Sequence, residues 1–137
     1  MALIHVDAGV LIGFLDAEDA HHSTARAVIA EALDRADRLA MATSALAECL
    51  VGPARRGDEA VNLVHDLRQR LPIEMVDLDV EIATAAAHLR ARHHSLRLPD
   101  ALVIATASVA RADHLVTTDR RWPSEKVLGI AVTIRTL

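Results

Sequence analysis

Four acidic side chains stand in apolar surroundings, where carboxylates are uncommon unless they have a partner. They are Asp7, Glu48, Asp100 and Asp119, found in the stretches ALIHVDAGVL, SALAECLV, LPDALVIATA and HLVTTD. Carboxylate oxygens are the ligands that Mg²⁺ and Mn²⁺ prefer. Positive residues are absent near Glu48, and the only lysine of the chain is Lys126. A divalent cation bound by several acids would satisfy all four carboxylates at once.

Each acid also has a plainer structural interpretation. Aspartate is frequent at helix N-caps and in turns, which would account for Asp7 and Asp119 separately. Pro99 suits the first turn of a helix, where the helix dipole favours the neighbouring Asp100. Glu48 is harder to explain in this way, because its apolar neighbours predict burial and a buried, unpaired carboxylate is strongly unfavourable. Glu48 therefore needs a partner.

Hydrophobic periodicity predicts short strands that alternate with amphipathic helices. The predicted strands are residues 2–6, 39–42, 73–78, 114–118 and 130–134. The predicted helices are residues 8–15, 21–37, 44–57, 58–71, 81–92 and 99–112, the third interrupted at Gly52-Pro53 because proline breaks the helical hydrogen-bond ladder. No hairpin dipeptide joins two strands, so the pattern indicates an α/β domain with a mainly parallel sheet.

The predicted sheet gives the acids a common location. Asp7 and Asp119 each follow a strand, and Asp100 opens a helix. The carboxyl ends of parallel strands and the adjoining helix starts lie at one edge of such a sheet, where ligands bind. We therefore expect the acids to converge there as a metal site. Their mutual repulsion should raise the pKa values of the folded, metal-free carboxylates.

Four stretches in this order resemble the PIN-domain nucleases and, within them, the VapC-type toxins of toxin–antitoxin pairs. The stretches, which run from the first strand to Trp122, are VDAGVLIGFLD, TSALAECLVGPARRG, LRLPDALVIATA and HLVTTDRRW. The resemblance implies a three-layer α/β/α sandwich with a mainly parallel central sheet. It also implies a metal-dependent endoribonuclease with Mg²⁺ or Mn²⁺ as cofactor, RNA as substrate, a cognate antitoxin protein as partner, and a homodimer.

The resemblance also assigns individual residues. The catalytic and metal-ligating acids of the family match Asp7, Glu48, Asp100 and Asp119. The pair Thr117-Thr118 resembles the hydroxyl-bearing step before the last acid. Gly9 is a departure, because the family usually has a hydroxyl or amide side chain two positions after the first aspartate.

Two other functions compete with this interpretation. Asp77 and Asp79 follow the predicted strand at 73–78 and resemble the first motif of HAD-like phosphatases, which also need a catalytic lysine further along the chain. Only Lys126 is available, and an N-cap role for Asp79 is the better explanation. The second alternative is a PIN-like interaction module without catalysis. Metal-dependent RNA cleavage distinguishes the nuclease from both.

Composition limits how RNA could be held. The formal net charge of −4 requires a local basic patch or metal ions to bind a polyanion. The candidate patches are Arg55-Arg56, Arg90 with Arg92 and Arg97, and Arg120-Arg121. Arg120 and Arg121 directly follow Asp119, so we expect them to contact RNA. The eight histidines lack the spacing and the cysteine companions of a zinc site.

Length and hydropathy predict a single domain. The 137 residues, 52% of them hydrophobic, suffice for one packed core over residues 1–137. The single cysteine, Cys49, excludes an internal disulfide and fits a reducing compartment. No basic leader and no apolar run of roughly 20 residues is present. We therefore expect a soluble, cytoplasmic protein without a membrane partner.

Overall fold

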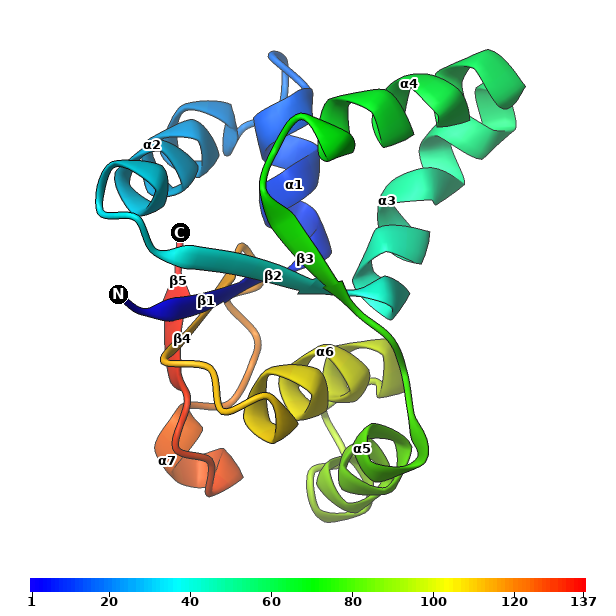
Figure 1. Ribbon diagram of the computed structural model, residues 1–137. Helices are drawn as coiled ribbons and strands as arrows, with labels where there is room; N and C mark the ends of the chain where they lie inside the picture. The colour runs from blue at the N-terminus through cyan, green and yellow to red at the C-terminus, as the bar shows by residue number, and fades with distance from the viewer.

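The computed structural model describes residues 1–137 and contains one five-stranded sheet between two layers of helices (Figure 1). The strands are β1 (Leu3–Val6), β2 (Arg38–Ala42), β3 (Ile73–Val76), β4 (His114–Thr117) and β5 (Thr133–Thr136). Their order across the sheet is β3-β2-β1-β4-β5, and every neighbouring pair is parallel. The predicted α/β/α architecture with a mainly parallel sheet is confirmed.

Seven helices connect the strands. They are α1 (Ala8–Leu15), α2 (His22–Asp34), α3 (Thr43–Arg56), α4 (Asp58–Gln69), α5 (Val80–Arg92), α6 (Leu98–Val109) and α7 (Glu125–Leu128). In Figure 1, α1 and α2 lie on one face of the sheet, and α5 and α6 lie on the other. Helices α3 and α4 pair with each other beside α1. None of the helices combines the length and the apolar character needed to cross a membrane.

The core lies where α1 and α6 cover the central strands. Strands β1 and β4 are neighbours in the sheet, and Val6 and Leu115 within them are fully buried. Helix α6 buries a nearly continuous apolar run, including Ala101, Ile104 and Ala105. A strand between two helical layers is apolar on both faces. The polar residues that follow β1 and β4 are therefore held on a rigid base.

Two local predictions were wrong. Helix α3 continues through Pro53 and ends at Arg56. Gly57 caps it with a φ of 123°, which is unsuited to other residues. Pro53 is buried, and its packing offsets the single helical hydrogen bond that proline removes. Strand β5 occupies Thr133–Thr136 rather than residues 130–134, and the short helix α7 before it was not predicted. β5 is a mostly exposed edge strand, so it carries no clear burial pattern.

Candidate functional site

Asp7 is the most buried of the four predicted acids, with 8% of its surface exposed. It follows β1 and forms the N-cap of α1, where its Oδ1 accepts a hydrogen bond from the backbone N–H of Ala8 at 2.8 Å. Its Oδ2 accepts a second hydrogen bond from the Thr117 hydroxyl, also at 2.8 Å. The capping role suggested by the sequence is therefore real, and the same carboxylate is fixed on both oxygens.

Thr117 connects the ends of the two central strands. Its hydroxyl donates to Asp7 and accepts a hydrogen bond from the backbone N–H of Asp119 at 3.1 Å. The residue is fully buried. Because β1 and β4 pair in parallel up to Val6 and Val116, Asp7 and Asp119 leave the sheet at the same edge. The threonine fixes the position of one acid relative to the other.

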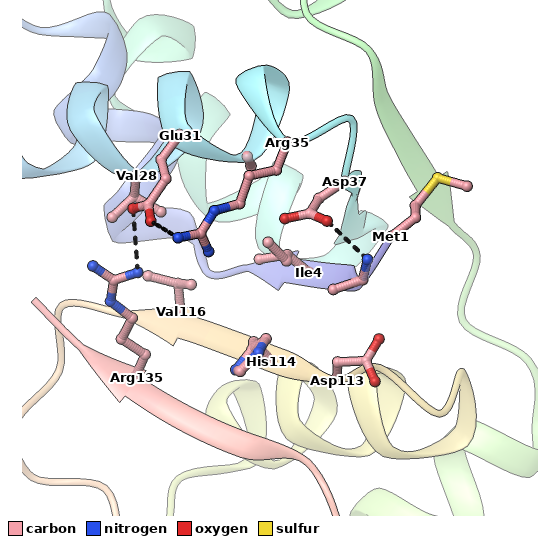
Figure 2. Close-up of a pocket in the computed structure, with 12 residues that line it drawn as sticks. Met1, Ile4, Val28, Glu31, Arg35, Asp37, Asp113, His114, Val116 and Arg135 are labelled. Carbon is pink, nitrogen blue, oxygen red and sulfur yellow. Dashed lines mark hydrogen bonds and ion pairs between the residues drawn. The ribbon is translucent and has the colours of Figure 1, made fainter.

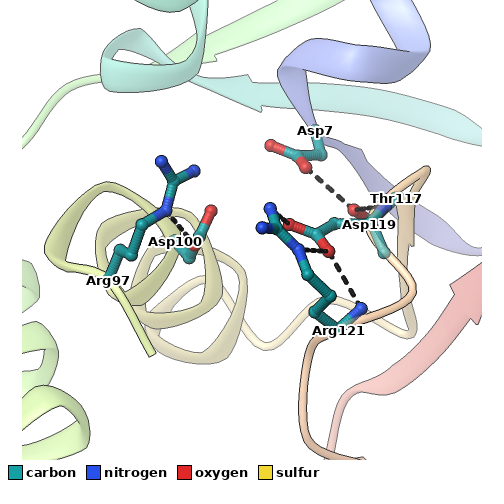
Figure 3. A network of polar contacts seen from close by, with 6 residues as sticks. All are labelled: Asp7, Arg97, Asp100, Thr117, Asp119 and Arg121. Carbon is teal, nitrogen blue, oxygen red and sulfur yellow. Dashed lines mark hydrogen bonds and ion pairs between the residues drawn. The ribbon is translucent and has the colours of Figure 1, made fainter. Parts of the chain in front are cut away.

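Asp100 and Asp119 each bind an arginine (Figure 3). Arg97, the residue before α6, places its Nε 3.3 Å from Asp100 Oδ2. Asp119 Oδ1 accepts from the backbone N–H and the Nε of Arg121 at 2.9 and 3.1 Å, and its Oδ2 accepts from the guanidinium at 3.0 Å. Sequence analysis did not predict these pairs, although the spacings Arg97 to Asp100 and Asp119 to Arg121 were available.

Glu48 lies on α3, but it is not buried as the sequence suggested. Helix α3 buries Ala45, Cys49 and Pro53, which recur every four residues, and Glu48 stands beside this row on an exposed flank. Partial burial of the carboxylate still raises its pKa, and the negative charges of Asp7 and Asp100 raise it further. The acid needs no buried partner, but it lies within electrostatic reach of the other acids.

The pKa values reveal a division among the acids. Burial is the main cause that raises the pKa of Asp7, and the charges of Asp100 and Asp119 add to it. The predicted increase is thus confirmed for Asp7 and Glu48. It is wrong for Asp119, because hydrogen bonds from Arg121 lower the pKa of that carboxyl. Asp7 thus lies within electrostatic reach of Asp100 and Asp119, and Glu48 within reach of Asp7 and Asp100. The four acids are called the acidic centre below.

The donor set suits a hard divalent cation, although its side chains are not arranged as a finished ligand shell. No group of three acidic, histidine or cysteine side chains lies close enough together to hold a metal ion as the side chains stand. In Figure 3, Asp100 and Asp119 are instead engaged by Arg97 and Arg121. Ion pairs with such exposed guanidinium groups are weak. All four side chains offer oxygen atoms only, which are the ligands that Mg²⁺ and Mn²⁺ prefer.

Gly9 is explained by its neighbour Thr118. A side chain at position 9 would collide with the Thr118 hydroxyl, because the Cβ of such a side chain would overlap its Oγ1. The hydroxyl of Thr118, the residue after β4, thus occupies the space beside α1 that a side chain at position 9 would fill. This explains why position 9 departs from the family pattern and is a glycine.

Asp79 has the structural role that sequence analysis favoured. Its Oδ1 accepts a hydrogen bond from the backbone N–H of Ile82 at 2.8 Å, which makes it the N-cap of α5. Asp77 and Asp79 are both exposed. The pair offers a matched control for changes at the four acids.

A separate hollow lies away from the acids. About 400 Å³ in volume, it lies beside α2 and reaches the amino ends of the strands, where Ala2, Asp37 and Asp113 stand (Figure 2). Glu31 pairs there with Arg35 at 2.7 Å and lies 3.9 Å from Arg135. None of the four acids lines this hollow. Asp7 and Asp119 follow β1 and β4, so they lie at the opposite edge of the sheet from this hollow.

The raised pKa values lead to a prediction for the metal-free protein. A carboxyl whose folded pKa exceeds its unfolded value binds a proton more tightly when folded, so stability falls as pH rises between the two values. In EDTA, Tm should fall from about pH 4 upward as Asp7 and Glu48 ionise, and Glu48→Gln should make the fall shallower. Thermal melts followed by circular dichroism at a series of pH values measure this.

Glu18→Gln, in the exposed turn after α1, is the matched control and should melt like the unchanged chain at every pH. Asp119 does not alter this pH profile. Because its folded pKa is lowered, its contribution to stability is complete at every pH above the ordinary pKa of aspartate and is lost only in stronger acid. Parallel pH profiles for Glu48→Gln and the unchanged chain would contradict the electrostatic coupling described above.

The fold is a parallel α/β/α sandwich of the PIN-like class, with Asp7 and Asp119 at the carboxyl edge of its sheet. The PIN domain family matches residues 4–126, and the chain belongs to this family. No curated protein sequence matches the chain significantly.

Solved structures extend the likeness over almost the whole chain. VapBC2 of Rickettsia felis, solved with a DNA fragment from its promoter, has a TM-score of 0.71 at 15% identity and covers 98% of both chains. VapC20 of Mycobacterium tuberculosis, described as a sarcin-ricin loop cleaving toxin, has a TM-score of 0.69 at 19% identity, covering 82% of this chain and 86% of that one. A toxin–antitoxin complex from Klebsiella pneumoniae has a TM-score of 0.64 at 24% identity, with 88% of each chain covered. At these identities the likeness concerns the fold.

Proposed function

We propose that the chain is a metal-dependent endoribonuclease that hydrolyses RNA phosphodiester bonds and serves as the toxin of a VapBC-type toxin–antitoxin pair. The observation that carries the proposal is the set of acids around one centre at the carboxyl edge of the sheet. The proposed metal-ligating and catalytic residues are Asp7, Glu48, Asp100 and Asp119. Membership of the PIN domain family supports the assignment, as do folds shared with VapBC proteins.

The side chains have distinct tasks in this proposal. A divalent cation, Mg²⁺ or Mn²⁺, would neutralise charge at the scissile phosphate and activate the attacking water. Asp7 is held by Ala8 and Thr117 on both oxygens, so it binds without reorganisation. Asp100 and Asp119 reach the same centre by leaving their arginines. Because the acids lie at the end of a parallel sheet, a phosphate can approach from solvent.

We also propose that a cognate antitoxin binds beside the site and that the chain forms a homodimer. A groove of about 580 Å³ runs between α1, α3 and α4 and is lined mainly by apolar residues. Glu48 is one of the residues that line the groove, and the lining residues Ile12 and Leu63 are exposed. An apolar antitoxin segment in this groove would continue over the acids. The related structures include toxin–antitoxin complexes, which supports such a partner.

RNA cleavage with defined metals tests the proposed activity. The purified chain should cleave a structured RNA with Mg²⁺ or Mn²⁺ and should lose this activity in EDTA, because the acids cannot neutralise the phosphate without a cation. The same preparation is assayed on a phosphomonoester. Phosphate release from that compound would favour the phosphatase alternative, whereas RNA binding without cleavage under any metal would favour an interaction module.

A further inference from the structure

Two arginines cover the acidic centre from the solvent side. Arg97 and Arg121, called the arginine pair below, come from the residue before α6 and the loop after β4. Their side chains are 66% and 80% exposed, whereas their partners Asp100 and Asp119 are 14% and 18% exposed. Figure 3 shows the Arg121 guanidinium between Asp100 and Asp119, and the Arg97 guanidinium on the other side of Asp100. The arginine pair therefore lies between the carboxylates and the solvent.

The influence of each arginine extends beyond its own ion pair. The charge of Arg97 also opposes the rise in the pKa of Glu48 and contributes to the lowered pKa of Asp119. The charge of Asp100 raises the pKa of Arg121, which is bonded to Asp119. Both guanidinium groups thus lie within electrostatic reach of more than one of the acids. Each arginine therefore interacts electrostatically with an acid other than the one to which it is hydrogen-bonded.

No other arginine pairs with any of the four acids. Arg38 binds Glu74, and Arg35 binds Glu31, both away from the centre. Arg120, which sequence analysis grouped with Arg121, is exposed and makes no ion pair. In a chain with a net charge of −4, the arginine pair is the positive charge nearest to the proposed site.

We propose that the arginine pair is a phosphate clamp that a metal ion releases: it neutralises Asp100 and Asp119 in the metal-free site and binds RNA phosphates once a divalent cation takes those carboxylates. The inference rests on the nuclease function proposed above. A guanidinium and a cation compete for the same oxygens, so only one can occupy each carboxylate fully. A freed guanidinium has the planar donor geometry that binds phosphate through two parallel hydrogen bonds.

This arrangement couples metal and RNA binding. Metal binding frees the arginine pair for RNA, and by thermodynamic reciprocity RNA raises the affinity for metal by the same factor. It also protects the metal-free site, because paired acids repel one another less. The clamp makes two predictions of opposite sign, since loss of the arginines should favour the metal and disfavour RNA.

The first measurement is Mg²⁺ binding by calorimetry without RNA. The double variant Arg97→Gln/Arg121→Gln should bind Mg²⁺ roughly fivefold or more tightly, at the lower end of ordinary coupling between sites. The double variant Arg70→Gln/Arg111→Gln removes the same charge at exposed positions before β3 and β4, at the opposite edge of the sheet, and is the control. It should leave the Mg²⁺ affinity within about twofold of the unchanged chain, because screening weakens distant charges.

The second measurement is binding of a short, fluorescently labelled phosphorothioate RNA in saturating Mg²⁺. The affinity of Arg97→Gln/Arg121→Gln should fall, and the slope of log K against log salt should become shallower by about 1.4, because each phosphate contact on a single strand contributes roughly 0.7. The Arg70→Gln/Arg111→Gln control should change the slope by less than half as much. Melting curves of each variant in EDTA verify that it is folded.

The two assays separate the outcomes. An unchanged or weaker Mg²⁺ affinity in Arg97→Gln/Arg121→Gln overturns the competition between arginine and metal. An unchanged RNA salt slope overturns the phosphate contact. Neither result depends on cleavage, whereas the proposed nuclease function fails separately if the unchanged chain binds Mg²⁺ but leaves RNA intact.

Discussion

Asp7→Asn is expected to reduce metal-dependent RNA cleavage by at least about 100-fold, more than the loss typical of a residue that only supports a metal ligand. The substitution removes the charge of the acid that is already fixed in place by Ala8 and Thr117. Asparagine caps a helix about as well as aspartate, so α1 should remain intact. Cleavage rates and Mg²⁺ calorimetry, with a melting curve for each protein, measure the effect.

Asp79→Asn is the matched control for this experiment, because it changes another aspartate that caps a helix outside the acidic centre. It should retain nearly full activity. Glu48→Gln, Asp100→Asn and Asp119→Asn should also lose most of the cleavage. Full activity in Asp7→Asn would eliminate the proposed metal site, and selective loss in Asp79→Asn would return attention to the phosphatase alternative.

Thr117→Val should weaken both the fold and the activity. Valine has the same shape, but it leaves the Oδ2 of Asp7 and the backbone N–H of Asp119 without their partner. Each unsatisfied buried group destabilises by about 1–3 kcal/mol. For a chain of this length, we expect Tm to fall by roughly 5–15 °C. Cleavage should fall by about 10- to 100-fold at a temperature where the variant is folded, because a support of a metal ligand is lost.

Thr117→Ser separates the hydroxyl from the rest of the side chain. It keeps the donor to Asp7 and loses one methyl group in a fully buried position, so it should destabilise modestly and retain most of the activity. Chemical denaturation gives the free energy of unfolding for both variants. Equal losses of activity in Thr117→Val and Thr117→Ser would show that packing, rather than the hydrogen bond, is what the site requires.

The sequence alone predicted the sheet because its central strands are apolar runs that end at acids. The acids after β1 and β4 and at the start of α6 were singled out by the rule that ligands bind at the carboxyl ends of parallel strands. The capping role of Asp79 also followed from local chemistry. In each of these cases, neighbours in the sequence determine the structure.

Tertiary context decided the features that sequence analysis missed. Apolar residues surround Glu48 in sequence, but the rotation of α3 turns Cys49 inward and leaves Glu48 exposed. The pKa of Asp119 is lowered because a loop brings Arg121 back onto it, which charge counting among the acids did not include. Edge strand β5 carries too little burial to produce a pattern. Side-chain direction was the missing information for Glu48, loop path for Asp119, and the place of the strand at the sheet edge for β5.

Cys49 makes local opening of the molecule measurable. Its thiol contacts the backbone carbonyl of Ala8 at 3.5 Å, at the junction of α1 and α3, and it is the only cysteine of the chain. Burial, together with the charges of Asp7 and Glu48, raises its pKa to about 12. Almost no thiolate is present at neutral pH, so an alkylating reagent reacts only when the two helices separate. The rate of alkylation therefore measures how often α1 and α3 separate. Asp7 caps the first of these helices and Glu48 lies on the second, so the same rate reports how often the two acids move apart.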